Sequence, residues 1–595
     1  MDRLTSWLAM IARFGADWRR LARNEHFVLS FLAVALGILA AYGSIVFRLA
    51  IGAVQRFAFD AESERLFSAA NQLAWWKIML APAFGGLVIG LFVHFAMPGR
   101  RNRGVADVIE AGALHHGRMP LWAGVGAALA SATSIGFGAS VGREGPVVHL
   151  GATLSAWLAR QFRFGHATAL TLLGCGVASA VAASFNAPIA GVFFALEVVV
   201  GTYALATFTP VVIASVTGTI IARIHLGDFP AFTVPEFGIV SFFEFPAFVL
   251  LGLVSAVAAG VFMWSIMATE DKVKAIPLPA WLRPVFGGLA VGIIAVFFPQ
   301  VLGVGYEATD MALNATLSLW LLVALVFAKT AATAISLGTG FAGGVFSPSL
   351  YVGAMVGGAF GIVAGTVFPD FASSPGTYTI VGMGAVAAAV LGAPISTILV
   401  VFEITGDYGV TIAVMVAAAV ATVITQQIPG TSFFHWQLAR RGINIGRDRA
   451  RELLQSIPVR DAMEAAVGLI PMTMTGAELR ALFRETPRGV FFVVGDEDRL
   501  CGALTLDDVK HLVFDDGDNG PVDMEALARL NNAAILAEDS VERAHAVMDQ
   551  RGVDRLPVID DARMQRVVGM VRRKSILRAH NWALASAGGG QRSNR

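Results

Sequence analysis

One glutamate stands out because it lies in a segment that could bind an anion. Glu144 belongs to the run Gly142-Arg143-Glu144-Gly145-Pro146, between long apolar stretches. Since glycine lets the backbone approach closely and proline suits a first helical turn, the run predicts a helix N-terminus whose amides face a cavity. Helix N-termini bind anions without a fixed cation. A carboxylate there would compete with an anion for the same amides, and protonation would end that competition.

The turn recurs 202 residues later as Gly344-Val345-Phe346-Ser347-Pro348. A second motif repeats as well: Ala-Pro-Ile followed by Glu197 recurs as Ala-Pro-Ile followed by Glu403, at an offset of 206. Two linked features at nearly one offset indicate an internal repeat, and interrupted helices at matching positions of two halves point to a transport site. The alternative is that these glycines only allow close helix packing, which the symmetric pair of turns disfavours. The matching positions also favour one shared structural role for Glu197 and Glu403.

The charged residues divide the chain into two parts. Residues 446–595 hold 44 of them and the first 445 residues hold 43, in a chain that is 56% hydrophobic and 15% charged. Soluble proteins average about 25% charged residues. The composition therefore predicts a membrane domain followed by a soluble tail. It shows no basic field that would indicate nucleic-acid binding.

The elements that must position these motifs are apolar stretches, and several are shorter than the about 20 residues of a straight membrane span. Broken helices survive at membrane depth only where protein or a cavity covers their backbone. We therefore expect a thick helical bundle around an internal pathway. Arginine-rich segments before Phe27 and around Arg440 predict that both termini lie in the cytoplasm. The tail reads as two units, each with the order helix, strand, turn, strand, helix.

These motifs resemble those of the CLC family of chloride channels and chloride/proton exchangers. The resemblance covers about residues 30–430 and includes both turns, the run Phe185-Asn-Ala-Pro-Ile-Ala-Gly191 and Lys329. The tail resembles paired cystathionine-β-synthase (CBS) domains. The resemblance implies an α-helical multi-pass membrane protein with an inverted repeat of tilted, broken helices, followed by a small α/β tandem CBS domain. It also implies a homodimer with one anion pathway in each subunit.

The expected organisation combines these observations. It consists of a cytoplasmic N-terminal segment (1–26), a membrane domain (27–442) with repeat halves at about 27–224 and 245–430, a linker (443–452), a first CBS unit (453–516), an acidic linker (517–534), a second CBS unit (535–582) and a disordered tail (583–595).

The resemblance also implies a gate and a set of anion donors. Glu144 matches the family's gating glutamate, whose carboxylate occupies an anion site and leaves it when protonated. Chloride is the expected ion. Its binding residues are expected to be Gly142, Arg143, Gly145, Val345 and Phe346. Beyond that role, Arg143 is expected to tie a loop or a helix end, and His149 to be a packed, hydrogen-bonded histidine.

Three positions depart from the family pattern. Exchangers carry a proton-transferring glutamate directly after the position of Glu197, where this chain has Val198. The serine whose hydroxyl contacts the central ion corresponds to Arg103, and the tyrosine that completes the site corresponds to Phe434. Because losing a hydrogen bond to a charged group costs about 1.5–3 kcal/mol, we expect chloride to be held more loosely. Arg103 either offsets this loss as a cation or points away from the ion.

These departures bear on mechanism. Since valine cannot carry a proton, we expect passive, channel-like chloride conduction across the plasma membrane, gated by Glu144. A chloride/proton antiporter with an unconventional proton route is the alternative. An intramembrane enzyme is disfavoured, because the membrane half has no zinc-protease, serine-hydrolase or nucleotide-loop motif. No metal site and no catalytic residue are expected.

The tail raises the question of a nucleotide. In the resembled family, some CBS pairs bind adenine nucleotides through a Thr or Ser and an Asp after the last strand. Thr505 and Asp508 match this pattern in the first unit, whereas the second unit has Arg572 and Ser575. One ribose-binding carboxylate is therefore missing, which favours a structural or dimerising tail over nucleotide regulation. No other cofactor is expected.

Overall fold

The computed structural model forms two compact units, residues 1–444 and 445–595, so the division between them falls within the predicted linker 443–452. The structure describes residues 25–61, 66–162, 164–227, 232, 238–427, 432–443, 454–455, 457–465, 468–486, 490–514, 523–528, 533–561 and 565–579. The disordered tail predicted for 583–595 lies outside the described residues. So does almost all of the N-terminal segment.

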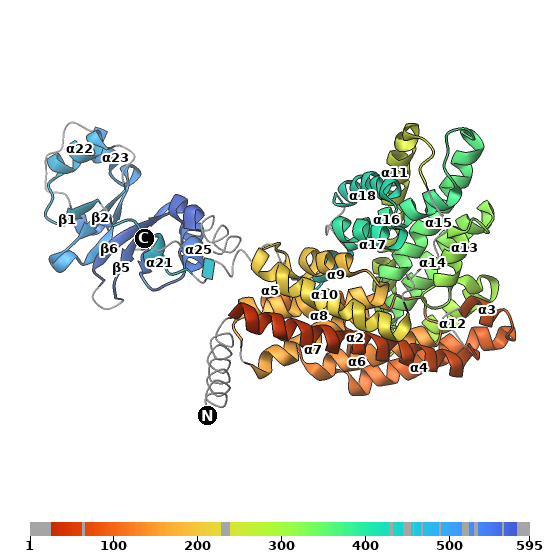
Figure 1. Cartoon of the computed structure of the whole chain (residues 1–595). Coiled ribbons are helices and arrows are strands. Elements are labelled where there is room, and N and C mark those ends of the chain that lie inside the picture. The colour runs from red at the N-terminus through yellow and green to blue at the C-terminus, as the bar shows by residue number, and fades with distance from the viewer. Residues whose placement is uncertain are drawn as a thin grey trace, which may run out of the picture. The chain divides into compact units, whose positions relative to one another are not determined.

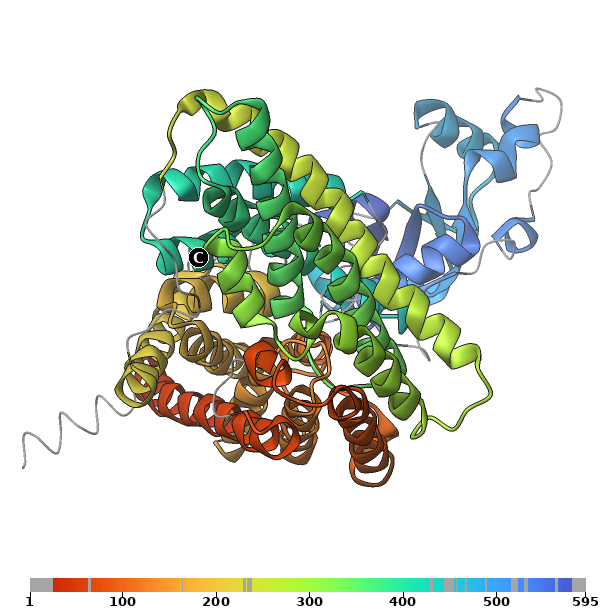
Figure 2. The same cartoon turned by 90° about the vertical axis from the view of Figure 1, so that its right-hand side faces the viewer.

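The membrane unit is built of helices (Figures 1 and 2). The helices of the first half are α2 (Glu25–Phe59), α3 (Leu66–Ala70), α4 (Trp75–Ala96), α5 (Val105–Leu114), α6 (Leu121–Gly136), α7 (Glu144–Gln161), α8 (His166–Phe185), α9 (Pro188–Phe194), the π-helical turn η2 (Ala195–Val200) and α10 (Leu205–Leu226). Those of the second half are α11 (Phe245–Ala275), α12 (Arg283–Phe297), α13 (Tyr306–Leu313), α14 (Leu319–Thr339), α15 (Phe346–Val367), α16 (Pro375–Leu391), α17 (Pro394–Thr405), α18 (Tyr408–Thr425) and α19 (Phe433–Arg440).

Helix length varies as the broken apolar stretches predict. Among the described residues, eight helices are long and apolar enough to cross a membrane, and further apolar helices such as α9 and α17 are shorter. The local cause of one break is visible in the sequence. Helix α8 ends on Asn186 and α16 ends on Gly392, both in the left-handed conformation (φ 58° and 66°). In each case an Ala-Pro pair follows, and the proline opens the next helix.

The two halves meet closely where α4 packs against α12. The run Pro82-Ala-Phe-Gly-Gly-Leu-Val-Ile-Gly90 of α4 recurs in α12 as Pro284-Val-Phe-Gly-Gly-Leu-Ala-Val-Gly292, again 202 residues later. A Cβ atom on Gly86 would lie 2.1 Å from the carbonyl oxygen of Pro284, and one on Gly288 would lie 2.1 Å from that of Pro82. The repeat is therefore present in the packing, because the same small residue on each helix faces the same backbone atom of the other.

A second pair of symmetric contacts joins α9 and α17. Glu403 accepts hydrogen bonds from the amides of Ile189 (2.8 Å) and Ala190 (2.7 Å) at the start of α9. Glu197 accepts them from Ile395 (3.2 Å) and Ser396 (2.9 Å) at the start of α17. Each glutamate thus satisfies the N-terminal amides of the other half's helix. This is the shared structural role that their matching positions favoured.

The tail contains two small sheets with a common topology. The first has strands β1 (Leu469–Pro471), β2 (Phe491–Val494) and β3 (Leu500–Leu504), and the second has β4 (Ile535–Leu536), β5 (Arg555–Ile559) and β6 (Val567–Arg572). In each sheet the first strand pairs in parallel with the second, and the third pairs antiparallel to it. The helices are α21 (Val459–Ala462), α22 (Gly476–Glu485), α23 (Leu506–Phe514), α24 (Met524–Ala528) and α25 (Val541–Arg551).

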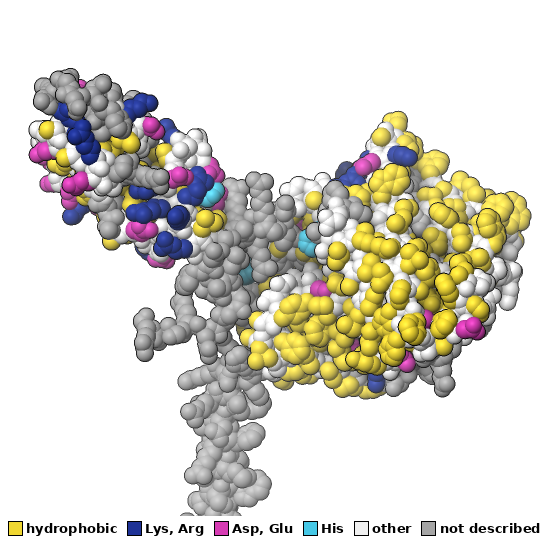
Figure 3. Space-filling view, turned by 90° about the horizontal axis from the view of Figure 1, so that it is seen from above, with side chains coloured by type: hydrophobic (Ala, Val, Ile, Leu, Met, Phe, Trp, Pro, Cys, Tyr) yellow, Lys and Arg dark blue, Asp and Glu magenta, His cyan; other side chains and the backbone are white. Residues whose placement is uncertain are grey.

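Two tail predictions need correction. Each unit has a third strand, β1 or β4, which is too short to give an alternating pattern. The segment predicted as the acidic linker 517–534 contains helix α24, and its Met524 is buried in the hydrophobic core of the first sheet. Figure 3 shows that the two units differ in surface, since hydrophobic side chains cover the visible face of the membrane unit while mixed charges cover the tail.

Candidate functional site

The two repeated turns open helices in the same frame. Arg143 and Val345 are the N-cap residues, and Glu144 and Phe346 are the first helical residues of α7 and α15. The first intrahelical amide donors are Val147 and Ser349, and a proline precedes each of them. The amides of the two residues before each proline (Glu144 and Gly145 in α7, Phe346 and Ser347 in α15) therefore have no partner within their own helix. The prediction of two helix N-termini is confirmed.

The turns are joined directly to each other. Gly142 donates its amide to the carbonyl of Gly344 at 2.7 Å, and Gly344 donates to the carbonyl of Gly142 at 2.8 Å. Glycine at position 145 lets the turns pack closely, since a Cβ there would lie 3.1 Å from the Cα of Gly344. One prediction is corrected here. The Gly142 amide already has a backbone partner and is not a donor for an anion.

Glu144 is held where these helix starts meet, and it is 1% exposed. Ser347, on the second residue of α15, donates its hydroxyl to one carboxylate oxygen. Tyr306, the first residue of α13, donates its hydroxyl to the other oxygen at 2.6 Å. The Arg143 Nε lies 3.7 Å from that second oxygen. The carboxylate therefore lies among donors that an anion would also use.

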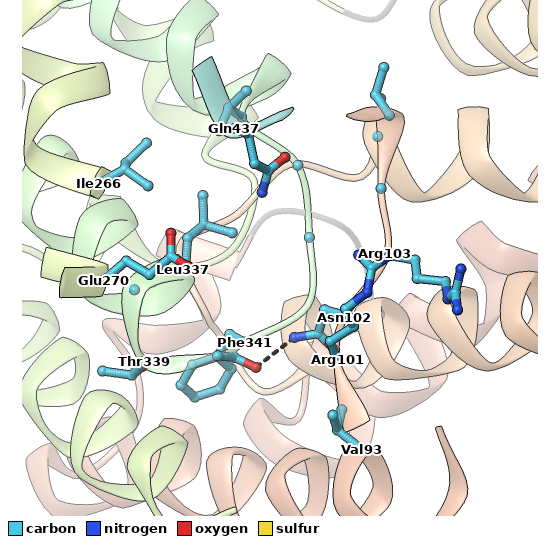
Figure 4. Close-up of a pocket in the computed structure, with 18 of the residues that line it drawn as sticks. Val93, Arg101, Asn102, Arg103, Ile266, Glu270, Leu337, Thr339, Phe341 and Gln437 are labelled. Atoms are coloured by element: carbon cyan, nitrogen blue, oxygen red, sulfur yellow. Dashed lines mark hydrogen bonds between the residues drawn. The ribbon is translucent and has the colours of Figure 1, made fainter. Parts of the chain in front are cut away.

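A cavity of about 1010 Å³, the vestibule, reaches Glu144 from one side. Five of the predicted site residues line it together with Glu144, namely Gly145, Val345, Phe346, Phe434 and Arg103. They come from α7, α15, α19 and the loop before α5, so the fold brings together segments that are far apart in the sequence. Figure 4 shows part of the wall, where Asn102 donates its side-chain amide to the carbonyl of Gly340 at 2.7 Å.

The vestibule carries an excess of positive charge. Its lining includes seven basic side chains (Arg100, Arg101, Arg103, Lys274, Arg283, Arg440 and Arg441) and three glutamates (Glu110, Glu144 and Glu270). A cleft lined by one sign of charge concentrates ions of the other sign. The cavity therefore favours the entry of anions.

Arg103 stands apart from the neighbouring arginines. Asp107 of α5 pairs with Arg101 at 2.7 Å and with Arg441 at 3.3 Å. Burial opposes ionisation of this carboxyl, but the two guanidinium groups and the amide of Gly104 together hold the pKa of Asp107 below its ordinary value. Among the described residues no carboxylate lies within ion-pair distance of Arg103, which interacts with Asp107 and Glu110 only at longer range.

Two predictions about individual residues need correction. Arg143 does not line the vestibule. It stacks over the ring of Tyr306 at 4.8 Å, donates to the carbonyl of Ser184 at 3.4 Å and lines a separate small cavity, which agrees with a tying role. His149 is buried, as expected, but neither ring nitrogen has a hydrogen-bond partner among the described residues. It faces a side cavity of about 110 Å³ that Asp107 and Arg103 also line.

Comparison with known proteins identifies this arrangement. The family model described as "Voltage gated chloride channel" matches residues 85–426, which include both helix starts and Glu144. The chain belongs to this chloride channel (CLC) family. A CBS domain model matches residues 527–581. CLC-type anion transport is the family's activity, and the tail includes a CBS region.

Named relatives agree with this membership. A "Putative chloride channel protein ClcB-like" from Ralstonia nicotianae is 34% identical over 69% of this chain and 96% of its own length. "Chloride channel protein CLC-e" from Arabidopsis thaliana is 28% identical over 83% of this chain and 77% of its own length.

Solved structures share the CLC fold. A "slow cyanobacterial Cl-/H+ antiporter" has a TM-score of 0.63 with 22% identity and covers 69% of this chain and 97% of its own. A "eukaryotic CLC transporter" has a TM-score of 0.61 with 18% identity and covers 93% of this chain and 99% of its own. At these identities the likeness shows the fold.

Val198 lies in the π-helical turn η2, next to Glu197, and is half-buried. Since Glu197 binds the amides of α17, the ionisable group nearest this position has a structural task. π-Turns interrupt helices, often at functional sites. In this CLC chain the turn carries no ionisable side chain except that structural glutamate.

The candidate nucleotide residues of the tail bond to each other. Thr505 donates its amide (2.8 Å) and its hydroxyl (2.6 Å) to the same carboxylate oxygen of Asp508, at the start of α23. In the second unit, Ser575 donates to Glu464 at 3.1 Å, and Arg572 pairs with Glu464 at 3.2 Å. Both sites thus have internal partners, and nucleotide binding at Thr505 and Asp508 stays a prediction.

Two residues of the site were missed from the sequence, Ser347 and Tyr306. Ser347 was visible as the repeat counterpart of Gly145, the residue after the gate. Tyr306 follows a Gly-Val-Gly turn whose glycines have φ values of 58° and 91°. Lys329 fixes that turn, since its ammonium donates to the carbonyls of Val301 (3.0 Å) and Gly303 (2.8 Å). The available signal for Tyr306 was its position directly after this glycine turn, at the start of a short helix.

Proposed function

We propose that this CLC protein conducts chloride passively through the vestibule and past Glu144, whose carboxylate gates the path. The position of Glu144 carries the proposal. It is a buried carboxylate bonded to Ser347 and Tyr306 at the meeting point of two helix N-termini, with an anion-attracting cavity on one side. Protonation removes the negative charge of the side chain and weakens its hydrogen bonds to these donors, so an anion can replace it.

Channel-like conduction is favoured over proton exchange by Val198 and by the structural role of Glu197. A chloride/proton antiporter remains the second candidate, because the solved structures that share the fold include a Cl-/H+ antiporter. We further propose that the protein is a homodimer in the plasma membrane. Both termini and the basic mouth of the vestibule would face the cytoplasm, as basic residues favour that side.

The test is chloride and proton flux in liposomes that contain the purified full chain. Under a chloride gradient we expect chloride to move without uphill proton movement. Uphill proton movement would exclude the channel mechanism and support the antiporter. Absence of chloride flux would exclude both.

A second measurement tests the gate. Glu144→Gln keeps the side-chain shape but removes the titrating group, so chloride flux is expected to become insensitive to pH. Glu270→Gln changes another glutamate of the vestibule wall and serves as the control, with pH sensitivity retained. A Glu144→Gln protein with unchanged pH dependence would show that another group is the gate.

A further inference from the structure

A second cavity lies beyond Glu144, away from the vestibule. It measures about 20 Å³, and its walls include Gln55, Arg143, Gln300, Tyr306 and Glu307. The residues that line it and those that line the vestibule have no member in common. Helix α2 carries Gln55 near its C-terminus and has 35 residues, so it is about 52 Å long at 1.5 Å per residue. The small cavity therefore lies near the end of α2, far from the start of that helix.

This cavity is built to hold water. Gln55 is 3% exposed, and its side-chain oxygen has no hydrogen-bond partner among the described residues. The side-chain oxygen of Gln300 is also buried and also has no hydrogen-bond partner among the described residues. Buried polar atoms are almost always satisfied by protein or by ordered water. The volume suffices for about one water molecule.

The walls offer that water hydrogen-bond acceptors. The two glutamine oxygens are acceptors, and the hydroxyl oxygen of Tyr306 can accept a third hydrogen bond while its proton points to Glu144. Three acceptors match the three donors of a protonated water. The charged groups around this site are Arg143 and Glu307 in the walls and Lys329, whose ammonium would lie 3.2 Å from a Cβ on Gly305. Glu307 also accepts the amide of Ser68 at 3.0 Å.

Tyr306 is fixed between this cavity and the gate. Its hydroxyl lies 2.6 Å from the Glu144 carboxylate. The guanidinium of Arg143 lies 4.8 Å from the centre of one ring face, and the Phe232 ring packs edge-on with centroids 5.0 Å apart. These contacts hold the phenol ring in one orientation, in which its hydroxyl faces the carboxylate.

We propose that Tyr306 relays protons between a single water held by Gln55 and Gln300 and the carboxylate of Glu144. The inference rests on the proposed gating role of Glu144. A protonated water gives a proton to the Tyr306 hydroxyl oxygen, while the original hydroxyl proton passes to Glu144. Tyrosine ends unchanged, the water becomes neutral and the carboxylate becomes a carboxylic acid. The reverse transfer closes the gate. Protons thus reach the gate from the side of the small cavity and not through the vestibule.

The experiment separates this route from the vestibule. Full-length protein is reconstituted in vesicles in one orientation, which protease digestion of the tail verifies. Chloride flux is then followed after a rapid pH change on one side only. Tyr306→Phe removes the hydroxyl and keeps the ring. Tyr351→Phe is the matched control, because the Tyr351 hydroxyl is also buried and has no partner among the described residues.

For Tyr306→Phe we expect the flux response to a pH change on the Gln55 side to slow at least tenfold, with an unchanged response on the vestibule side. Gln55→Leu should slow the same response and leaves Tyr306 in place, which covers the case that Tyr306→Phe does not fold. A wild-type rate in both variants would overturn the relay, as would equal slowing from both sides, which indicates a structural role. Wild-type protein without chloride flux would instead refute the proposed function, and pH-sensitive flux in Glu144→Gln would refute the gate.

Discussion

At the scale of single residues, the absence of a hydroxyl at Phe434 predicts how tightly the ion is held. The ring is 5% exposed and lines the vestibule together with Glu144. Phe434→Tyr adds a donor at the site wall, and a hydrogen bond to a charged group is worth about 1.5–3 kcal/mol. We expect the chloride dissociation constant to fall about tenfold to a hundredfold, measured by calorimetry in detergent.

Phe433 provides the control for this change. It lies on the same wall, and its ring centroid is 6.0 Å from that of Phe434. Phe433→Tyr should leave chloride affinity within about twofold of wild type, because a donor is useful only where it reaches the ion. Equal tightening by both variants would show that Phe434 has no special position at the site.

At the scale of elements, the helices depend on carboxylates from the other half of the repeat. Glu197 and Glu403 each accept two amides at the start of α17 and α9. Glu197→Gln and Glu403→Gln turn an acceptor into a group that also donates, so one amide at each helix start loses its partner. Each change should lower the free energy of unfolding by about 1.5–3 kcal/mol, measured by thermal unfolding in detergent.

The pH dependence of flux distinguishes this structural role from proton transfer. Both variants should keep the wild-type pH profile, whereas a proton-transferring residue would change it. Glu270→Gln tests the specificity of the stability loss. In the described structure, Glu270 of the vestibule wall pairs only with Lys274, one helical turn away, and such pairs contribute about 0.3–0.5 kcal/mol. A loss of stability in Glu270→Gln as large as in the other two would contradict the capping account.

What could be predicted at this scale was local. The glycine-proline turns fixed the starts of α7 and α15 because those residue types act within one helical turn. The contacts of Tyr306 and Ser347 with Glu144 could not be predicted, since 162 and 203 residues separate the partners and only the packed fold brings them together. The prediction that the Gly142 amide binds an anion failed for the same reason, because this amide bonds to Gly344, which belongs to the other half. Strands β1 and β4 escaped prediction because two or three residues show no period.

At the scale of the whole molecule, the repeat is a property of packing as well as of motifs. Helices α4 and α12 join the two halves through Gly86, which faces the carbonyl of Pro284, and Gly288, which faces the carbonyl of Pro82. The site depends on this interface, because α7 and α15 belong to different halves and Gly90 of α4 and Pro284 of α12 line the same vestibule as Glu144. A substitution at the α4–α12 interface should lower the stability of the membrane unit and leave its ion selectivity unchanged.

This dependence gives a prediction with a built-in control. A methyl group on Gly86 or Gly288 would lie 2.1 Å from a carbonyl oxygen, so the helices must separate. Gly86→Ala and Gly288→Ala should each lower the free energy of unfolding by about 1–3 kcal/mol, seen as a lower Tm in detergent. Gly52→Ala lies in α2 with nothing within 4 Å of the new methyl and should not lower Tm, since alanine is the better helix former.

The double variant decides whether the interface acts as a unit. Gly86 and Gly288 face the same pair of helices, so the separation forced by one methyl also relieves the clash of the other. Neighbouring sites of this kind are not additive, and the loss in the double variant should be smaller than the sum of the single losses. Full additivity would mean that the two glycines act independently, and that the symmetry between α4 and α12 does not extend to their energetics.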